Sequence, residues 1–197
     1  AGSGAPDSVN DHLHVAYERP QETSEFSSLP SLDAVIWAHG LNCSDVISDF
    51  DLEDLERLWQ SNVVFIASSL SALLTAGKLL AGSRLVVVSS IWQQESRPGR
   101  FSYTISKAAL RGLVKSCALD LGERGILINA VLPGVVDTPM TRANLSSEQI
   151  KGIVDQSALR RLAEPSDIAS AVAFLAASSN RAITGQFLTV DAGFIGM

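Results

Sequence analysis

Short runs of apolar, often β-branched residues alternate along the chain with longer segments in which apolar positions recur at helical spacing. Parallel strands that are buried on both faces form nearly continuous apolar runs, whereas helices that cover a sheet show a period of about 3.6 residues. Strands are predicted in five ranges: 12–17, 33–38, 83–90, 126–132 and 186–190. The alternation predicts an α/β protein with a doubly wound parallel sheet.

Helices are predicted between the strands in three ranges: 51–77, 101–122 and 165–177. The first helix is expected to be interrupted or bent near Gln60. Pro165 suits the first turn of the last helix, because proline lacks an N–H group that would have no partner there, and Asp167 favours the positive end of the helix. The polar, weakly periodic stretch 139–158 predicts a lid or a loose pair of helices over a binding site.

The length of 197 residues and the hydrophobic content of 46% predict one globular domain, residues 1–197, with a sizeable core. Residues 1–11 are expected to be a flexible lead-in. They contain no basic segment followed by an apolar run, so a secretory signal is not predicted. The formal net charge of −6 disfavours nucleic acid and anionic membranes as partners, because both bind basic surfaces. Small molecules and other protein chains are the expected partners.

The chain contains two cysteines, Cys43 and Cys117, and their spacing suggests neither a disulfide framework nor a zinc site. A reducing cytoplasm is therefore the expected location. His12 and His14 alternate on a predicted strand without a third ligand nearby, so no metal site is predicted.

No charged residue occurs between Arg57 and Lys78, a stretch long enough to span a membrane. The stretch nevertheless carries seven polar side chains: Gln60, Ser61, Asn62, Ser68, Ser69, Ser71 and Thr75. We therefore favour a helix that is buried between neighbouring elements or across a subunit interface.

Candidate chemistry lies where the predicted strands end, because ligands of open parallel sheets bind beyond the carboxyl ends of the strands. Ser90 ends a strongly apolar strand, and Tyr103 and Lys107 open the helix that follows. Positions four apart share one helix face. A nearby ammonium stabilises a phenolate and lowers a phenol pKa of about 10, which suits tyrosine for acid–base catalysis. The alternative is a pair of solvated side chains on one helix face.

The order of these residues resembles that of the short-chain dehydrogenase/reductase family. The family pattern comprises a helix asparagine, a serine thirteen positions before a tyrosine, Tyr-x-x-x-Lys, and a strand ending in Pro-Gly. It is matched here by Asn62, Ser90, Tyr103 with Lys107, and 133–134. The closing segment "RRLAEPSDIASAVAFLAASSNRAITGQFLTVDAGF" also matches the family, so that the resemblance covers residues 33–195.

The resemblance implies a Rossmann-like fold and an NAD- or NADP-dependent enzyme that interconverts a carbonyl and an alcohol. Tyr103 would be the general acid in reduction and the base in oxidation, and Ser90 would orient and polarise the substrate oxygen. Lys107 would lower the pKa of Tyr103 and hold the nicotinamide ribose, and Asn62 would support a water-linked proton path to Lys107.

The resemblance also assigns residues to cofactor binding. Asn62, Tyr103 and Lys107 belong to this set, and further members lie at strand ends: Gly40, Pro133, Gly134, Val136 and Thr138. The backbone of Val136 and the hydroxyl of Thr138 match the positions that hold the nicotinamide carboxamide, and 139–158 would be the substrate lid.

Two features depart from the family pattern. The family's first βαβ unit carries a Thr-Gly-x-x-x-Gly-x-Gly turn that holds the cofactor pyrophosphate, and nothing in this chain matches it. The "GSGA" at 2–5 has neither a preceding strand nor a following helix pattern. The segment "IWAHG" stands where the family usually has Asn-Asn-Ala-Gly, so that Gly40 fits while Trp37 and His39 are larger than the family residues.

Large aromatic residues near the strand ends allow alternative roles. His39 is expected to cover part of the cofactor region or to bond a neighbouring backbone group, and a catalytic role is the alternative. Trp92 follows Ser90 closely and either lines a substrate pocket or packs in the core.

The first βαβ unit of the family is thus missing or rebuilt, which would leave a central sheet edge unpaired. Three solutions remain open. The 12–17 strand pairs directly with the 33–38 strand through the helix-like stretch 21–32, another chain covers the edge, or the polypeptide is a truncation.

Two functions follow from these observations. The first is an active oxidoreductase with an abbreviated or rebuilt pyrophosphate site. The second is a non-catalytic or auxiliary subunit that does not bind nicotinamide cofactor by itself. The family usually pairs subunits through its two long helices, here 51–77 and 101–122, and through the C-terminal segment. The resemblance therefore implies a homodimer or homotetramer, with a full-length homologue as a further possible partner.

Overall fold

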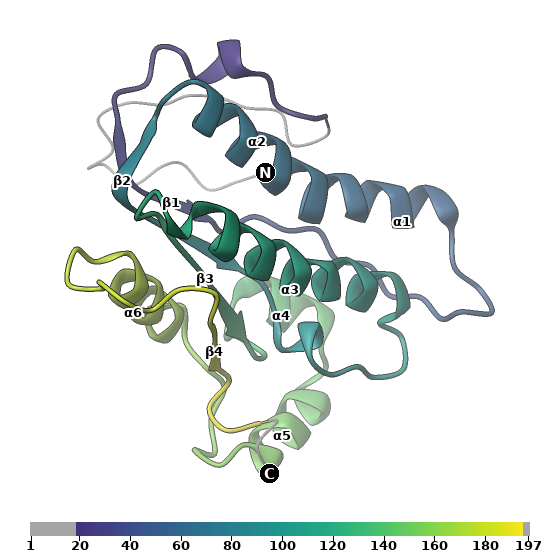
Figure 1. The fold of residues 1–197 in the computed structure, drawn as a ribbon. Coiled ribbons are helices and arrows are strands. Elements are labelled where there is room, and N and C mark those ends of the chain that lie inside the picture. The colour runs from purple at the N-terminus through teal and green to yellow at the C-terminus, as the bar shows by residue number, and fades with distance from the viewer. Residues whose placement is uncertain (1–18, 195–197) are drawn as a thin grey trace.

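A four-stranded parallel sheet forms the centre of the protein in the computed structural model, which describes residues 19–194. Its strands, in spatial order, are β1 (Leu32–Trp37), β2 (Leu79–Val88), β3 (Leu127–Pro133) and β4 (Phe187–Val190) (Figure 1). Each strand runs parallel to its neighbour. The predicted parallel sheet is confirmed for these four strands. The predicted strand at 12–17, and its pairing with β1, lie outside the described residues.

The predicted helices form close to their expected bounds. The α-helices are α1 (Leu52–Trp59), α2 (Phe65–Thr75), α3 (Phe101–Gly122), α4 (Pro139–Asn144), α5 (Ser147–Gln156) and α6 (Pro165–Ala176). Short 3-10 turns occur at η1 (Thr23–Phe26) and η3 (Ile91–Gln93), so that the expected helix-like stretch 21–32 contains a single turn. The predicted interruption near Gln60 is a π-helical segment, η2 (Gln60–Val64), between α1 and α2.

Helix ends follow the signals in the sequence. Pro165 opens α6, and Asp167 and Glu164 form a reciprocal capping box at its start. The stretch expected to be a lid consists of two separately capped helices, α4 and α5.

Helices cover both faces of the sheet, as Figure 1 shows for α2 and α3 on one side and α6 on the other. Because successive strand residues point to opposite faces, Leu85 and Val87 of β2 pack in the core on the α2 and α3 side. Val86, between them, packs with Leu175 of α6. This packing on two faces explains the apolar run 85–88 of β2 and the apolar residues of β3, in which Asn129 is the one polar residue.

The segment Leu52–Thr75 is long and apolar enough to cross a membrane by length and composition, and 44% of its most apolar window is buried inside the protein. Leu58, Ile66 and Leu70 are at most 3% exposed. Helices in the core of a sheet protein pass the same test, so the finding is weak evidence for a span. The packing supports the prediction of a helix buried between neighbouring elements.

The loop after β1 fixes the start of α3. The Asp45 carboxylate accepts hydrogen bonds from the backbone N–H of Ser102, at 3.0 Å, and from the Ser102 hydroxyl. The backbone N–H of Phe101 donates to the Asp45 carbonyl at 3.3 Å. A carboxylate at the positive end of a helix is favourable, and here it joins two segments far apart in the chain. The loop thereby sets the position of Tyr103 in the first turn of α3.

We expect Asp45→Ala to lower the free energy of unfolding by about 1–2 kcal/mol, because two donors at the start of α3 lose their acceptor. Urea unfolding of the variant measures this loss. Asp49→Ala is the matched control, since it removes an exposed carboxylate from the same loop region. Equal stability of the two variants would contradict the assigned role of Asp45.

Candidate active site

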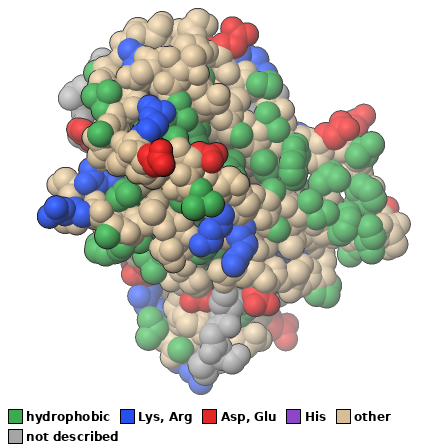
Figure 2. Space-filling view, viewed as in Figure 1, with side chains coloured by type: hydrophobic (Ala, Val, Ile, Leu, Met, Phe, Trp, Pro, Cys, Tyr) green, Lys and Arg blue, Asp and Glu red, His purple; other side chains and the backbone are tan. Residues whose placement is uncertain are grey.

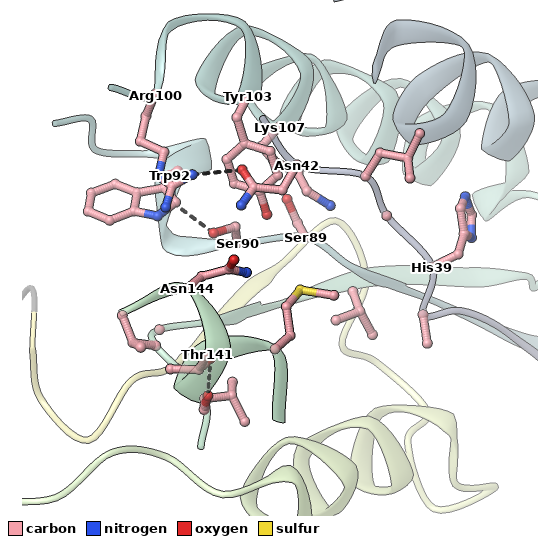
Figure 3. Close-up of a pocket in the computed structure, with 18 of the residues that line it drawn as sticks. His39, Asn42, Ser89, Ser90, Trp92, Arg100, Tyr103, Lys107, Thr141 and Asn144 are labelled. Carbon is pink, nitrogen blue, oxygen red and sulfur yellow. Dashed lines mark hydrogen bonds between the residues drawn. The ribbon is translucent and has the colours of Figure 1, made fainter. Parts of the chain in front are cut away.

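One cleft of about 370 Å³ lies where the carboxyl ends of β1, β2 and β3 meet. Six of the predicted site residues line it: Gly40, Ser90, Tyr103, Lys107, Gly134 and Val136. Asn62 is buried behind these residues, Pro133 ends β3, and Thr138 precedes α4. Figure 3 shows Ser89, Ser90, Tyr103 and Lys107 gathered on one side of the cleft.

Lys107 is a buried cation that has no hydrogen-bond partner among residues 19–194. Its side chain lies against Tyr103, with Nζ 5.7 Å from the centre of the phenol ring, and the residue is 3% exposed. Burial lowers the pKa of Lys107 to about 8, so the ammonium remains mostly protonated at neutral pH. Because Lys107 lines the cleft, its donors are available to a ligand.

The pKa of Tyr103 is raised rather than lowered. Burial disfavours the phenolate, and this effect exceeds the opposing effects of a hydrogen bond with Ser90 and the charge of Arg100. The prediction of a phenol pKa lowered by Lys107 is therefore wrong for the site as it stands. A tyrosine that stays protonated at neutral pH suits the donation of a proton during reduction.

The π-helical segment η2 directs Asn62 toward the loop after β1. The Asn62 amide donates to the Leu41 carbonyl and to the Ser106 hydroxyl, both at 3.0 Å, and its oxygen accepts from the Leu41 N–H at 2.8 Å. These bonds connect the loop to α3 next to Lys107. Asn62 therefore acts in this structure as a link between segments, and its role in a water-linked proton path remains a prediction.

Gly40 leaves room for the Lys107 ammonium. A Cβ atom at this position would lie 3.2 Å from Lys107 Nζ and 3.5 Å from Asn62 Oδ1. An alanine here would therefore require the flexible end of Lys107 to shift by a few tenths of an ångström. The glycine of the "IWAHG" segment thus allows the close approach of the buried lysine.

Two serines end β2 in different environments. The Ser90 hydroxyl accepts a bond from the Trp92 N–H at 3.3 Å and lies near Tyr103. The Ser89 hydroxyl lines the cleft, is buried, and has no hydrogen-bond partner among residues 19–194. Sequence reasoning missed Ser89, although a second serine after an apolar strand was the available signal. Both serines offer donors to a ligand.

The segment after β3 is tightly held. A Cβ atom at Gly134 would lie 2.6 Å from Asp191 Cβ, and the Gly134 N–H donates to the Val190 carbonyl at 3.0 Å. The Val136 carbonyl accepts from the Thr141 hydroxyl at 2.6 Å.

Thr138 is the capping residue of α4. Its hydroxyl accepts from the Thr141 N–H and donates to the Thr141 hydroxyl, each at 3.2 Å. The assignment of Thr138 and Val136 to carboxamide binding stays a prediction.

The residues that depart from the family pattern have structural roles. Trp37 is 4% exposed, and its indole N–H donates to Ser69 at 2.9 Å. His39 Nε2 lies 2.9 Å from the Ser61 carbonyl, so this nitrogen must be the donor. Burial is the main cause of the lowered pKa of His39, which favours a neutral ring. The prediction that His39 bonds a backbone group is confirmed.

Trp92 lines the cleft, which agrees with the first of its two predicted roles, lining a pocket, rather than with packing in the core. Arg97 and Arg100 line it too, and the sequence analysis singled out neither. Among residues 19–194 there is no group of three or more histidine, cysteine, aspartate or glutamate side chains that could hold a metal ion. The predicted absence of a metal site stays a prediction, because His12 and His14 lie outside the described residues.

Comparisons with known proteins find relatives over most of the chain. The family model described as enoyl-(acyl carrier protein) reductase matches residues 24–195. The chain is 30% identical over 192 residues to the 3-oxoacyl-(acyl-carrier-protein) reductase FabG of Escherichia coli. This alignment covers 98% of this chain and 77% of FabG. The alignments span 65% to 77% of the length of these curated relatives.

Solved structures show the same fold. A short-chain dehydrogenase family protein from Francisella tularensis superposes with a TM-score of 0.82 at 28% identity, over 89% of this chain and 75% of the other. A blue fluorescent protein from a metagenomic library, solved in complex with NADPH, superposes with a TM-score of 0.76 at 32% identity, over 87% and 68% of the two chains. The chain belongs to the short-chain dehydrogenase/reductase family.

We expect Lys107→Met to raise the free energy of unfolding at pH 7 by about 1–3 kcal/mol, because the ammonium is buried and no counter-ion lies beside it in the described part of the chain. The lysine has a lower pKa in the folded chain than in the unfolded chain, so its penalty is full below pH 8 and disappears as the pH rises to about 10.5. The stability difference between variant and wild type should shrink over that range.

Urea unfolding at pH 7 to 10 measures the effect of Lys107→Met. Lys151→Met is the matched control, since Lys151 is an exposed lysine paired only with Asp155. A Lys107→Met variant that is less stable than wild type at pH 7 would contradict the unpaired state of the ammonium.

Proposed function

We propose that the protein is an NAD- or NADP-dependent oxidoreductase that interconverts a carbonyl and an alcohol. The observation that carries the proposal is the convergence of Ser90, Tyr103 and Lys107 in one cleft at the carboxyl ends of the strands. Membership of the short-chain dehydrogenase/reductase family supports the same chemistry.

The residues present fit the nicotinamide end of such a cofactor. The Lys107 ammonium has free donors for the ribose hydroxyls. Gly40 lines the cleft beside the ammonium and has no side chain that would obstruct the ribose. The relative solved with NADPH supports this cofactor class. The chain carries no glycine-rich turn that we can assign to the pyrophosphate.

A nicotinamide held there would supply a hydride in reduction and accept one in oxidation. In the reductive direction, the Ser90 hydroxyl donates a hydrogen bond to the substrate carbonyl oxygen. The Tyr103 phenol would give its proton to that oxygen, and this proton together with the hydride from the cofactor would yield the alcohol. The Lys107 charge stabilises the phenolate that remains, and Asn62 holds the loop that positions Gly40 beside the ammonium.

We also propose self-association through α1, α2 and α3. Figure 2 shows apolar side chains over α1 and the loop before it. These exposed residues include Ile47, Leu52 and Trp59, at 67%, 59% and 42%. Burial of such a surface against a second copy would remove apolar area from water. The expected cytoplasmic location stays a prediction.

Titration of the purified chain with NADH and NADPH, followed by calorimetry, tests cofactor binding. We expect saturable binding of at least one of them below about 1 mM, the upper end of ordinary enzyme affinities. No binding of either at that concentration would contradict the active-enzyme proposal. It would instead favour an auxiliary subunit that does not bind cofactor by itself.

We expect Tyr103→Phe to lower the rate of carbonyl reduction by at least about 100-fold, because the phenol is the proton donor. Cofactor affinity should change little, since the ring and the neighbouring Lys107 remain. Steady-state kinetics and the calorimetric titration measure the two quantities. Turnover that survives in the Phe variant would overturn the assigned role.

A further inference from the structure

Two arginines from the loop between Ser90 and Tyr103 extend into the cleft. Arg97 and Arg100 line it together with Ser90, Tyr103 and Lys107. Figure 3 shows Arg100 beside Trp92, with Asn144 of α4 across the cleft. Arg97 also borders the adjoining hollow under α5, where Gln149 and Ile153 lie. The arginines therefore occupy the side of the cleft that faces the lid helices α4 and α5.

Neither arginine has a carboxylate partner among the described residues. Four other arginines form ion pairs there, namely Arg19, Arg57, Arg142 and Arg161. The Arg97 guanidinium instead lies over the Trp92 ring, 5.4 Å from its centre. Arg100 donates through Nη1 to Asn42 Oδ1 at 2.8 Å and to the Cys43 carbonyl at 3.1 Å, and its other nitrogens have no partner in the described part. The guanidinium groups thus keep donors available.

The charges at this cleft are of one sign, although the chain has a net charge of −6. Burial is the main cause of the lowered pKa of Arg97, because it disfavours the charged guanidinium. The positive charge of the neighbouring Arg100 lowers this pKa further. Arg100 is also near enough to lower the pKa of Tyr103, and Lys107 adds a third cation. An anionic group placed among these cations would relieve their repulsion.

We propose that Arg97 and Arg100 form a subsite that selects carbonyl or alcohol substrates carrying a carboxylate or phosphate group. The inference rests on the proposed oxidoreductase function and names the substrate class of the same cleft. Arginine suits this role, since its planar fork binds both oxygens of a carboxylate or phosphate. The Arg97 guanidinium packs over the Trp92 ring, and the Asn42 and Cys43 bonds hold Arg100 in position before the ligand arrives. The unpaired Ser89 hydroxyl adds a donor in the same cleft.

The test compares an anionic substrate with a neutral one of the same skeleton. With the preferred cofactor, kcat/KM is measured for acetoacetate and for its ethyl ester. We expect the ratio of the two values to favour acetoacetate in the wild type and to fall by about 10- to 100-fold in the Arg97→Gln/Arg100→Gln double variant, as expected for lost charge-assisted hydrogen bonds. Arg100→Lys should retain part of the preference. Arg181→Gln is the matched control, because Arg181 is exposed and does not line the cleft.

Calorimetric titration of the cofactor-free chain with acetoacetate, and separately with inorganic phosphate, gives a readout that does not depend on turnover. We expect binding of at least one of these anions, weakening as salt is added and lost in the double variant. The anion that binds with the higher affinity shows whether the subsite prefers a carboxylate or a phosphate.

Three results would overturn the subsite: no binding of either anion, anion binding that survives the double substitution, or a double variant whose main defect is weaker NADPH binding, which would assign the arginines to the cofactor. Failure of the oxidoreductase proposal is distinguishable from these results. In that case no cofactor binds, and the anion titrations still decide the role of the arginines.

Discussion

The burial of the Lys107 ammonium, which has no counter-ion among residues 19–194, is the constraint around which the site is built. Gly40 leaves the space for it, and Asn62 ties the loop after β1 to α3 beside it. The π-helical segment η2 supplies Asn62, and insertions of this kind are frequent at functional sites. Such an arrangement costs folding free energy, which is consistent with donors reserved for a ligand.

Arg97 and Arg100, which also line the cleft, likewise have no carboxylate partner among the described residues. Lys107 at the floor and Arg97 and Arg100 at the lid side leave three cations around the protonated Tyr103. Their combined field favours negative charge. In the proposed reaction it would stabilise both an anionic substrate and the phenolate left on Tyr103, so that substrate selection and proton transfer would depend on one electrostatic arrangement.

The features that could be predicted from the sequence are those marked by a regular pattern of apolar residues or by a fixed residue spacing. Apolar runs located β1 to β4, and the spacing of Tyr103 and Lys107 placed both residues in one cleft. Contacts between distant segments left no periodic signal, such as the bonds from Ser102 to Asp45, 57 positions earlier. Arg97 was missed because it lies in an irregular loop, where no periodic pattern indicates which way a side chain faces.

The pKa of Lys107 tests the central claim most directly. The chain has four lysines, so selective ¹³Cε labelling and the Lys107→Met variant allow its NMR signal to be assigned. The account predicts titration at about pH 8 in the ligand-free chain, with a signal that shifts on addition of NADPH or NADH. A Lys107 that titrates near its ordinary value of about 10.5 and does not respond to either cofactor would contradict it.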